Sequence, residues 1–208
     1  MVIHKVPSSI QAVFPKREWK IPAEGKTVFL TFDDGPVPGA TDFVLNELAK
    51  RNQQATFFVV GDNVRKHADL AKAVIQSAHQ IGNHTYHHLK GWKTDLETYL
   101  NDVDRCDQIL AEKLGLETKL FRPPYGQLRP SQAKELLQSK RVIMWDVLSG
   151  DYDFDLNDEQ VLKGSTEKMD AGSIVVFHDQ EKTKERLTRV LPTFLDYLVD
   201  RGWKTELL

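Results

Sequence analysis

The chain has 208 residues, enough to bury one substantial core and too few for two ordinary enzyme domains. Its 28 basic and 30 acidic residues give a formal net charge of -2, which excludes the strong positive charge typical of proteins that bind nucleic acid or anionic membranes. The single cysteine, Cys106, excludes an intramolecular disulfide and a metal site built from several thiolates. The absence of an apolar leader or spanning segment predicts a cytoplasmic protein.

Residues 1–25 contain three prolines and no sustained periodicity, which predicts an extended N-terminal arm. Phe14 and Trp19 indicate that this arm docks on the rest of the molecule. Residues 26–208 are expected to form a single domain.

Beyond the arm, apolar runs alternate with amphipathic patterns. The predicted strands cover residues 27–32, 55–60, a short segment ending at 83–84, 120–122, 142–145, 173–178 and 203–207. The predicted helices cover residues 40–51, a stretch after the second strand to about 79, 94–114, 131–139, 157–169 and 184–201. This alternation predicts an α/β protein with a parallel sheet covered by helices. The number of strands favours a closed or nearly closed barrel, with an open doubly wound sheet as the alternative.

Polar residues stand where the predicted strands end. These residues are Asp33–Asp34, His84, Arg122, Trp145–Asp146 and His178–Asp179. In a parallel barrel the carboxyl ends of the strands lie at one face, where catalytic groups gather. We therefore expect a functional site at that face.

Asp33 and Asp34 are adjacent carboxylates after a strongly apolar strand. Neighbours on an extended chain point in different directions, so one can bind a metal while the other faces a substrate. The spacing leaves open which residue does which. A solvated Asp-Asp-Gly turn is the non-functional alternative.

Three histidines fall within the five residues from His84 to His88. Both His87 and His88 are within reach of His84 in a turn or helix, so the spacing leaves the pairing open. Two histidines and one aspartate form a ligand set that leaves positions free for water and substrate. Zinc suits this set best, and cobalt, nickel or manganese would also fit.

Two further strand ends carry cationic or titratable groups. Arg122 precedes a proline turn and can hold a carboxylate by paired hydrogen bonds. His178 ends an apolar strand, where a lone histidine is more often a core residue than an acid. Its position beside the other polar strand ends favours a role in the site.

These motifs, in this order, resemble those of the polysaccharide deacetylases, carbohydrate esterase family 4. The resemblance runs over residues 26–208 and is carried by the segments 31–36, 84–88, 122–125, the region of Asp151, and His178. It implies a distorted (β/α) barrel of seven or eight strands, one divalent metal ion, and hydrolysis of an acetyl group by a metal-activated water. The implied substrate is an acetylated carbohydrate.

The resemblance also implies roles for eight residues. Asp34, His84 and His88 would be the metal ligands. Asp33 would be the general base, Arg122 would hold Asp33, the backbone N–H of Tyr125 would stabilise the oxyanion, His178 would be the general acid, and Asp151 would orient His178.

The sequence departs from the family pattern at two motifs. Leu148 and Tyr152 replace the first aspartate and the tryptophan of the fourth motif, and Val176 replaces the leucine of the fifth. Both changes fall where the acetyl methyl group is expected.

The predicted substrate is an oligo- or polysaccharide containing N-acetylglucosamine. The alternatives are an esterase that removes O-acetyl groups from a glycan such as xylan, and a non-catalytic barrel that binds sugar. A phosphodiesterase is disfavoured because neither a second carboxylate-rich metal site nor a basic phosphate clamp is evident.

Overall fold

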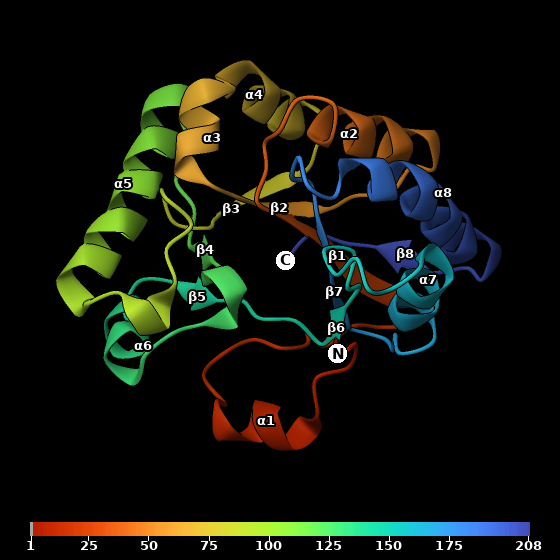
Figure 1. The fold of residues 1–208 in the computed structure, drawn as a ribbon, viewed down its shortest axis with the longest axis horizontal. Helices are drawn as coiled ribbons and strands as arrows, with labels where there is room; N and C mark the ends of the chain where they lie inside the picture. Colours follow the sequence, from red (N-terminus) through yellow and green to blue (C-terminus); the bar gives the residue numbers. More distant parts are fainter. Residues whose placement is uncertain (1) are drawn as a thin grey trace.

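The computed structural model describes residues 2–208 as a curled sheet of short strands ringed by helices (Figure 1). The strands are β1 (Thr27–Asp33), β2 (Thr56–Val59), β3 (Gln80–Asn83), β4 (Leu120–Phe121), β5 (Arg141–Val142), β6 (Val147–Leu148), β7 (Ile174–His178) and β8 (Lys204–Thr205). Seven of them lie side by side in the order β5-β4-β3-β2-β1-β7-β6, and β8 pairs with the start of β1. Each pairing is parallel, which confirms the predicted barrel-type α/β fold.

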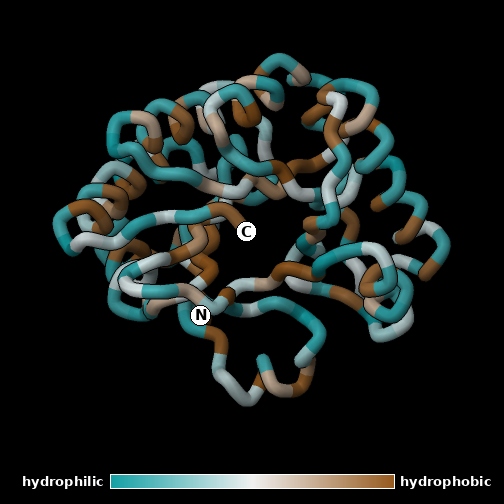
Figure 2. Tube along the Cα trace, turned by 180° about the vertical axis from the view of Figure 1, so that it is seen from behind, coloured by the Kyte–Doolittle hydropathy of each residue, from teal (hydrophilic) through white to brown (hydrophobic). Residues whose placement is uncertain are grey.

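The helices pack around this sheet because one stripe of each is apolar. They are α2 (Thr41–Lys50), α3 (Gly61–Lys66), α4 (Ala68–Gln76), α5 (Leu96–Leu114), α6 (Pro130–Leu136), α7 (Asp158–Thr166) and α8 (Lys184–Asp200), with 3-10 turns at Gly91–Lys93 and Pro124–Gly126. Hydrophobic residues gather along the inner strands, whereas hydrophobic and hydrophilic residues alternate along the surrounding helices (Figure 2). None of the helices within residues 2–208 combines the length and the apolar content needed to cross a bilayer.

The central strand β1 shows why the sheet forms where it does. All seven of its residues are buried, because β7 and β2 flank it, helices cover its outer face, and its inner face packs in the barrel interior. A continuous apolar run is the pattern expected for a parallel strand buried on both faces. Its last residue, Asp33, therefore emerges at the carboxyl end of the sheet with little access to water.

Two predicted elements are wrong in detail. Of the predicted strand at 142–145 only Val142 lies in a strand, the end of β5, and the next strand, β6, begins at Val147. The chain between them leaves the sheet and pairs with the N-terminal segment: the Met144 N–H donates to the Glu18 carbonyl. The predicted helix after β2 is two helices, α3 and α4, that meet at His67.

The N-terminal segment closes the side of the barrel between β5 and β6. Glu18 forms a bridge to Ile143, beside β5, and Lys5 forms one to Val147, in β6. Trp19 is buried, in agreement with the expectation that this segment docks, whereas Phe14 is exposed. It is not extended throughout, because Ser8–Val13 form the short helix α1, which buries none of its residues.

Candidate metal and hydrolytic site

The carboxyl ends of the strands surround one cavity of about 690 Å³. Its walls bring together six polar residues that the strand-end pattern or the family resemblance singled out, and they also include Trp145; the six are Asp33, Asp34, His84, His88, Tyr125 and His178. Because these residues come from β1, from the segments after β3 and β4, and from β7, only the folded sheet can assemble them.

Asp34, His84 and His88 form the candidate metal site. Each offers one ligand atom, and these atoms lie within 4.8 Å of one another. The Nε2 atom of His88 is 2.9 Å from Oδ1 of Asp34, and Nε2 of His84 is 3.5 Å from the same oxygen. Burial opposes ionisation of Asp34, but the two imidazoles hold the pKa of its carboxyl well below the usual range.

The donor set fits a cation. The Nδ1 atom of His84 lies 2.7 Å from the carbonyl oxygen of Arg122, so Nδ1 carries a proton, and in the neutral ring the lone pair of Nε2 points toward Asp34. Within residues 2–208, the buried Oδ1 atom of Asp34 has no hydrogen-bond partner of suitable geometry. An acceptor oxygen buried beside an imidazole lone pair is costly unless a cation binds between them.

The third histidine of the motif lies away from this cluster. The Nδ1 atom of His87 is 2.5 Å from Oδ1 of Asp102 on α5, and the ring is exposed. The other oxygen of Asp102 accepts the backbone N–H groups of Tyr86 and His87. The pairing that the spacing left open is therefore between His84 and His88.

The backbone of Asp34 is held in a rare conformation, with φ 82°. A non-glycine residue adopts such a φ only when its surroundings enforce it. The Nδ2 atom of Asn63 donates to the Asp34 carbonyl across 2.8 Å, and the Asp34 N–H donates to the Phe58 carbonyl. Sequence reasoning missed Asn63, which lies within α3 and not at a strand end.

Asp33 is paired with Arg122. The Nη1 atom of Arg122 lies 2.7 Å from Oδ1 of Asp33 and also donates to the hydroxyl of Thr31. Its Nη2 atom donates to the Met144 carbonyl. Both charged side chains are buried, so the charge of each offsets the cost of removing the other from water.

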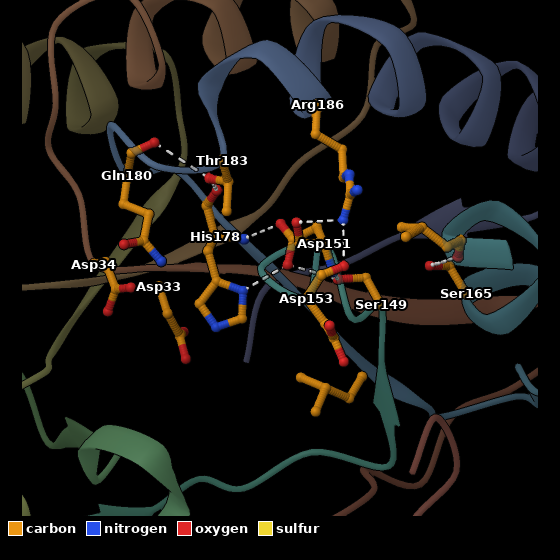
Figure 3. Close-up of polar contacts among 12 residues, drawn as sticks. Asp33, Asp34, Ser149, Asp151, Asp153, Ser165, His178, Gln180, Thr183 and Arg186 are labelled. Atoms are coloured by element: carbon orange, nitrogen blue, oxygen red, sulfur yellow. Dashed lines mark hydrogen bonds and ion pairs between the residues drawn. The ribbon is translucent and has the colours of Figure 1, made fainter. Parts of the chain in front are cut away.

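His178, which is in register with Asp33 on the neighbouring strand, is paired with Asp151 (Figure 3). The Nδ1 atom of His178 is 2.7 Å from Oδ1 of Asp151, whose Oδ2 accepts the His178 backbone N–H across 2.8 Å. Ser149 also donates to Oδ1 of Asp151. Burial alone would lower the pKa of His178, but the carboxylate of Asp151, with Asp34 and Asp33 farther away, raises it to about 9.

The positions at which the fourth and fifth motifs depart from the family pattern also face the cavity. Leu148, Tyr152 and Val176 line it. The ring of Tyr152 meets the His178 ring edge to face at 5.1 Å. Tyr125, at φ 58°, packs its half-exposed ring 4.7 Å from His88.

Asp146, which sequence reasoning placed at a strand end, does not belong to the site. Asp146 precedes β6 instead of ending a strand, and it is buried against Lys5, at 2.7 Å, and the Ser173 hydroxyl, at 2.5 Å. Its neighbour Trp145 does line the cavity. The sheet reaches its carboxyl end only after Leu148, which is why Asp151 supplies the carboxylate.

Comparisons with known proteins agree with this geometry. A family model described as polysaccharide deacetylase matches residues 20–141. A peptidoglycan-N-acetylglucosamine deacetylase of Listeria monocytogenes is 31% identical over 182 residues, which are 86% of this chain and 37% of that protein. One of Bacillus cereus is 30% identical over 188 residues, 89% of this chain and 88% of its own length.

Solved structures show the same likeness. The crystal structure of the peptidoglycan N-acetylglucosamine deacetylase Bc1960, in complex with a benzamide, superposes with a TM-score of 0.83 at 26% identity. The match covers 98% of this chain and 95% of that one. The chain spans little more than a third of the Listeria relative but nearly all of Bc1960.

Proposed function

The chain belongs to the polysaccharide deacetylase family, and from this premise we propose that it is a hydrolase that removes N-acetyl groups from a glycan containing N-acetylglucosamine. The observation that carries the proposal is one cavity with three groups on its wall: a cluster of metal ligands, a carboxylate held by an arginine, and a histidine held by a second carboxylate. Amide hydrolysis needs an activated water, a polarised carbonyl and a proton for the leaving nitrogen.

Asp34, His84 and His88 would hold one divalent metal ion. Imidazole and carboxylate ligands suit zinc first, and also cobalt, nickel or manganese. When bound, such an ion activates a water molecule and polarises the acetyl carbonyl. The hydrogen bond from His84 to the Arg122 carbonyl fixes the ring orientation that leaves Nε2 for the metal.

Asp33 would accept the proton of the attacking water. Arg122 binds its Oδ1 atom, and its Oδ2 atom lies on the side of His84, 3.9 Å from Nε2. The base is therefore held beside the metal ligands without being one of them. Positioning of this kind is the contribution that a general base needs from the protein.

His178 would protonate the nitrogen that leaves. The carboxylate of Asp151 raises the pKa of His178 and so favours the protonated imidazole, and it fixes the ring by binding Nδ1, so Nε2 is left for the substrate. The backbone N–H of Tyr125, at the cavity rim, would donate to the oxyanion.

The carbohydrate is inferred from the relatives, which are named peptidoglycan N-acetylglucosamine deacetylases. A cavity of about 690 Å³ is large enough for a sugar ring with its acetamido group. Trp145, Leu148 and Val176 give it an apolar wall on which an acetyl methyl group can pack.

Acetate release across a panel of substrates tests the proposal. The panel contains N-acetylated chito-oligosaccharides, peptidoglycan, acetyl-xylan and small N-acetyl sugars, each with metal-stripped and zinc-reloaded protein. We expect release from the N-acetylglucosamine polymers, none after stripping, and recovery on reloading.

His178→Ala separates amide from ester cleavage. An alcohol leaves with less help from an acid than an amine does, so the variant should lose amide cleavage more than ester cleavage. Release from acetyl-xylan alone would replace the proposal by an O-acetyl esterase. Tight oligosaccharide binding by metal-loaded protein that releases no acetate would replace it by a non-catalytic sugar-binding barrel.

A further inference from the structure

The start of α8 binds the backbone of both members of the His178–Asp151 pair (Figure 3). The Nη1 atom of Arg186 donates to the Asp151 carbonyl across 3.1 Å, and the Thr183 hydroxyl donates to the His178 carbonyl. Both side chains are buried. One helix end thus reaches the two segments, after β6 and after β7, whose side chains form the pair.

Arg186 holds more than one point of the segment between β6 and α7. Its Nη1 atom also donates to the Asp153 carbonyl across 2.6 Å, and Nη2 donates to the Leu156 carbonyl across 2.7 Å. Nε lies 3.3 Å from Oδ1 of Asp158, at the start of α7. Because a guanidinium carries five donors in a rigid plane, it can satisfy three carbonyls at once, which an ammonium group cannot do in the same geometry.

This segment carries the residues that set the position of His178. Asp151 binds the His178 ring and backbone, and Tyr152 packs against the same ring. A shift of this segment by about 1 Å would break a hydrogen bond of 2.7 Å, and misplacement on that scale is costly for catalysis. Arg186 is the cation whose hydrogen bonds to backbone carbonyls fix this segment.

We propose that Arg186 is a positioning residue of the hydrolase: by binding the carbonyls of the 151–156 segment it holds Asp151 in hydrogen-bonding register with His178. The inference rests on the proposed function, in which His178 is the acid. In the described part of the chain, Arg186 is not among the residues that line the cavity, so it acts through Asp151 and does not touch the substrate.

Substitution of Arg186 tests the proposal, with Arg189 as the matched control. Arg186→Met keeps an unbranched side chain but removes all five donors, whereas Arg186→Lys keeps the charge and one point of attachment. Arg189 lies one turn further along α8 and also pairs with Asp158, but its remaining contact is the Glu185 carbonyl. Arg189→Met therefore removes a cation from the same helix without releasing the 151–156 segment.

The expected kinetic result is a selective loss of amide cleavage. In Arg186→Met, kcat for an N-acetyl substrate should fall roughly 10- to 100-fold with little change in KM, and Arg186→Lys should be intermediate. Cleavage of an O-acetyl ester, which needs less help from the acid, should fall less. Arg189→Met should stay within about twofold of the wild type on both substrates, because exposed ion pairs contribute little.

A second measurement does not depend on turnover. The Nδ1 proton of His178, bound to Asp151, should give a downfield resonance in the zinc-loaded wild type and in Arg189→Met. We expect this resonance to be shifted or lost in both Arg186 variants. If Arg186→Met fails to fold, Arg186→Lys decides the question alone.

The outcomes separate the two proposals. Arg186 variants that keep both the resonance and the wild-type ratio of amide to ester cleavage would overturn the positioning role and leave the deacetylase activity standing. A wild type that releases no acetate from any substrate would overturn the proposed function, and loss of the resonance in the Arg186 variants would still support the contact between Arg186 and the Asp151–His178 pair.

Discussion

The Nη1 atom of Arg122 lies 2.7 Å from Oδ1 of Asp33, and neither side chain has appreciable access to water. The next carboxylate in the chain, Asp34, has different neighbours: its Oδ1 atom faces Nε2 of His88 and of His84. Two adjacent aspartates therefore face two different kinds of partner, a fixed cation and a pair of imidazoles. Their roles should be separable by mutation.

Asp33→Asn should abolish turnover while the protein still binds zinc. The amide keeps the size of the side chain and an acceptor for Arg122, but it cannot take a proton, and loss of a general base costs roughly 10²- to 10⁴-fold. Acetate release and zinc titration calorimetry on the same preparation measure the two properties. Asp34→Asn is the matched variant and should bind zinc at least about tenfold more weakly, as expected when a charged ligand is lost. If Asp33→Asn loses zinc and Asp34→Asn keeps it, the two roles are reversed.

Arg122→Met should destabilise the protein through Asp33. The substitution leaves a buried carboxylate without its cation, and removing one partner of a buried ion pair costs about 3–5 kcal/mol. Urea unfolding measures the loss. The double variant Arg122→Met/Asp33→Asn should recover part of it, since the uncompensated charge is gone while the bonds to Thr31 and Met144 remain broken. A double variant no more stable than Arg122→Met would show that the unpaired charge of Asp33 does not cause the loss.

The part of the site that lies at strand ends could be predicted because it follows from burial. A strand with apolar residues on both faces must end where the chain reaches water or a cavity, and polar residues such as Asp33 and His178 mark that point. The same rule misplaced Asp146, because the chain leaves the sheet and returns to it as β6 before reaching the carboxyl end. Where a chain bends out of the sheet and then re-enters it as another short strand, the sequence pattern at the bend is the same as at a true strand end.

Contacts between distant segments could not be predicted. Asn63 and Arg186 act on the backbone carbonyls of other loops, and such contacts leave no periodicity in the sequence. Spacing could not choose between His87 and His88 either, because the segment is an irregular turn, with positive φ at Thr85 and His88, not a helix with a fixed repeat. The cytoplasmic location stays a prediction.

His178 should titrate well above the ordinary value of 6.5 in the metal-free protein, with a pKa of about 9. Because the folded-state pKa is the higher one, the protonated ring stabilises the folded state fully below pH 6.5, and this contribution is lost as the pH rises through about 9. Titration of the His178 ring by NMR measures it. Asp151→Asn should lower the pKa by removing the nearest negative charge. An unchanged pKa in Asp151→Asn, or a wild-type value near 6.5, would contradict the assignment.

Asp179 should give the metal-free protein an unusual dependence of stability on pH. The carboxyl is fully buried, binding the Gly35 N–H and the Thr41 hydroxyl, and burial, with Asp34 nearby, raises its pKa from 3.8 to about 8. The folded state keeps the proton over a range in which the unfolded chain loses it, so this group favours unfolding increasingly as the pH rises from 3.8 to about 8. Asp179→Asn stays neutral and can keep both hydrogen bonds, which predicts a flatter profile of urea midpoint against pH. The Thr41→Val variant, which removes one hydrogen bond and keeps the carboxyl, should retain the slope. Parallel profiles for wild type and Asp179→Asn would show that the carboxyl is ionised in the folded protein.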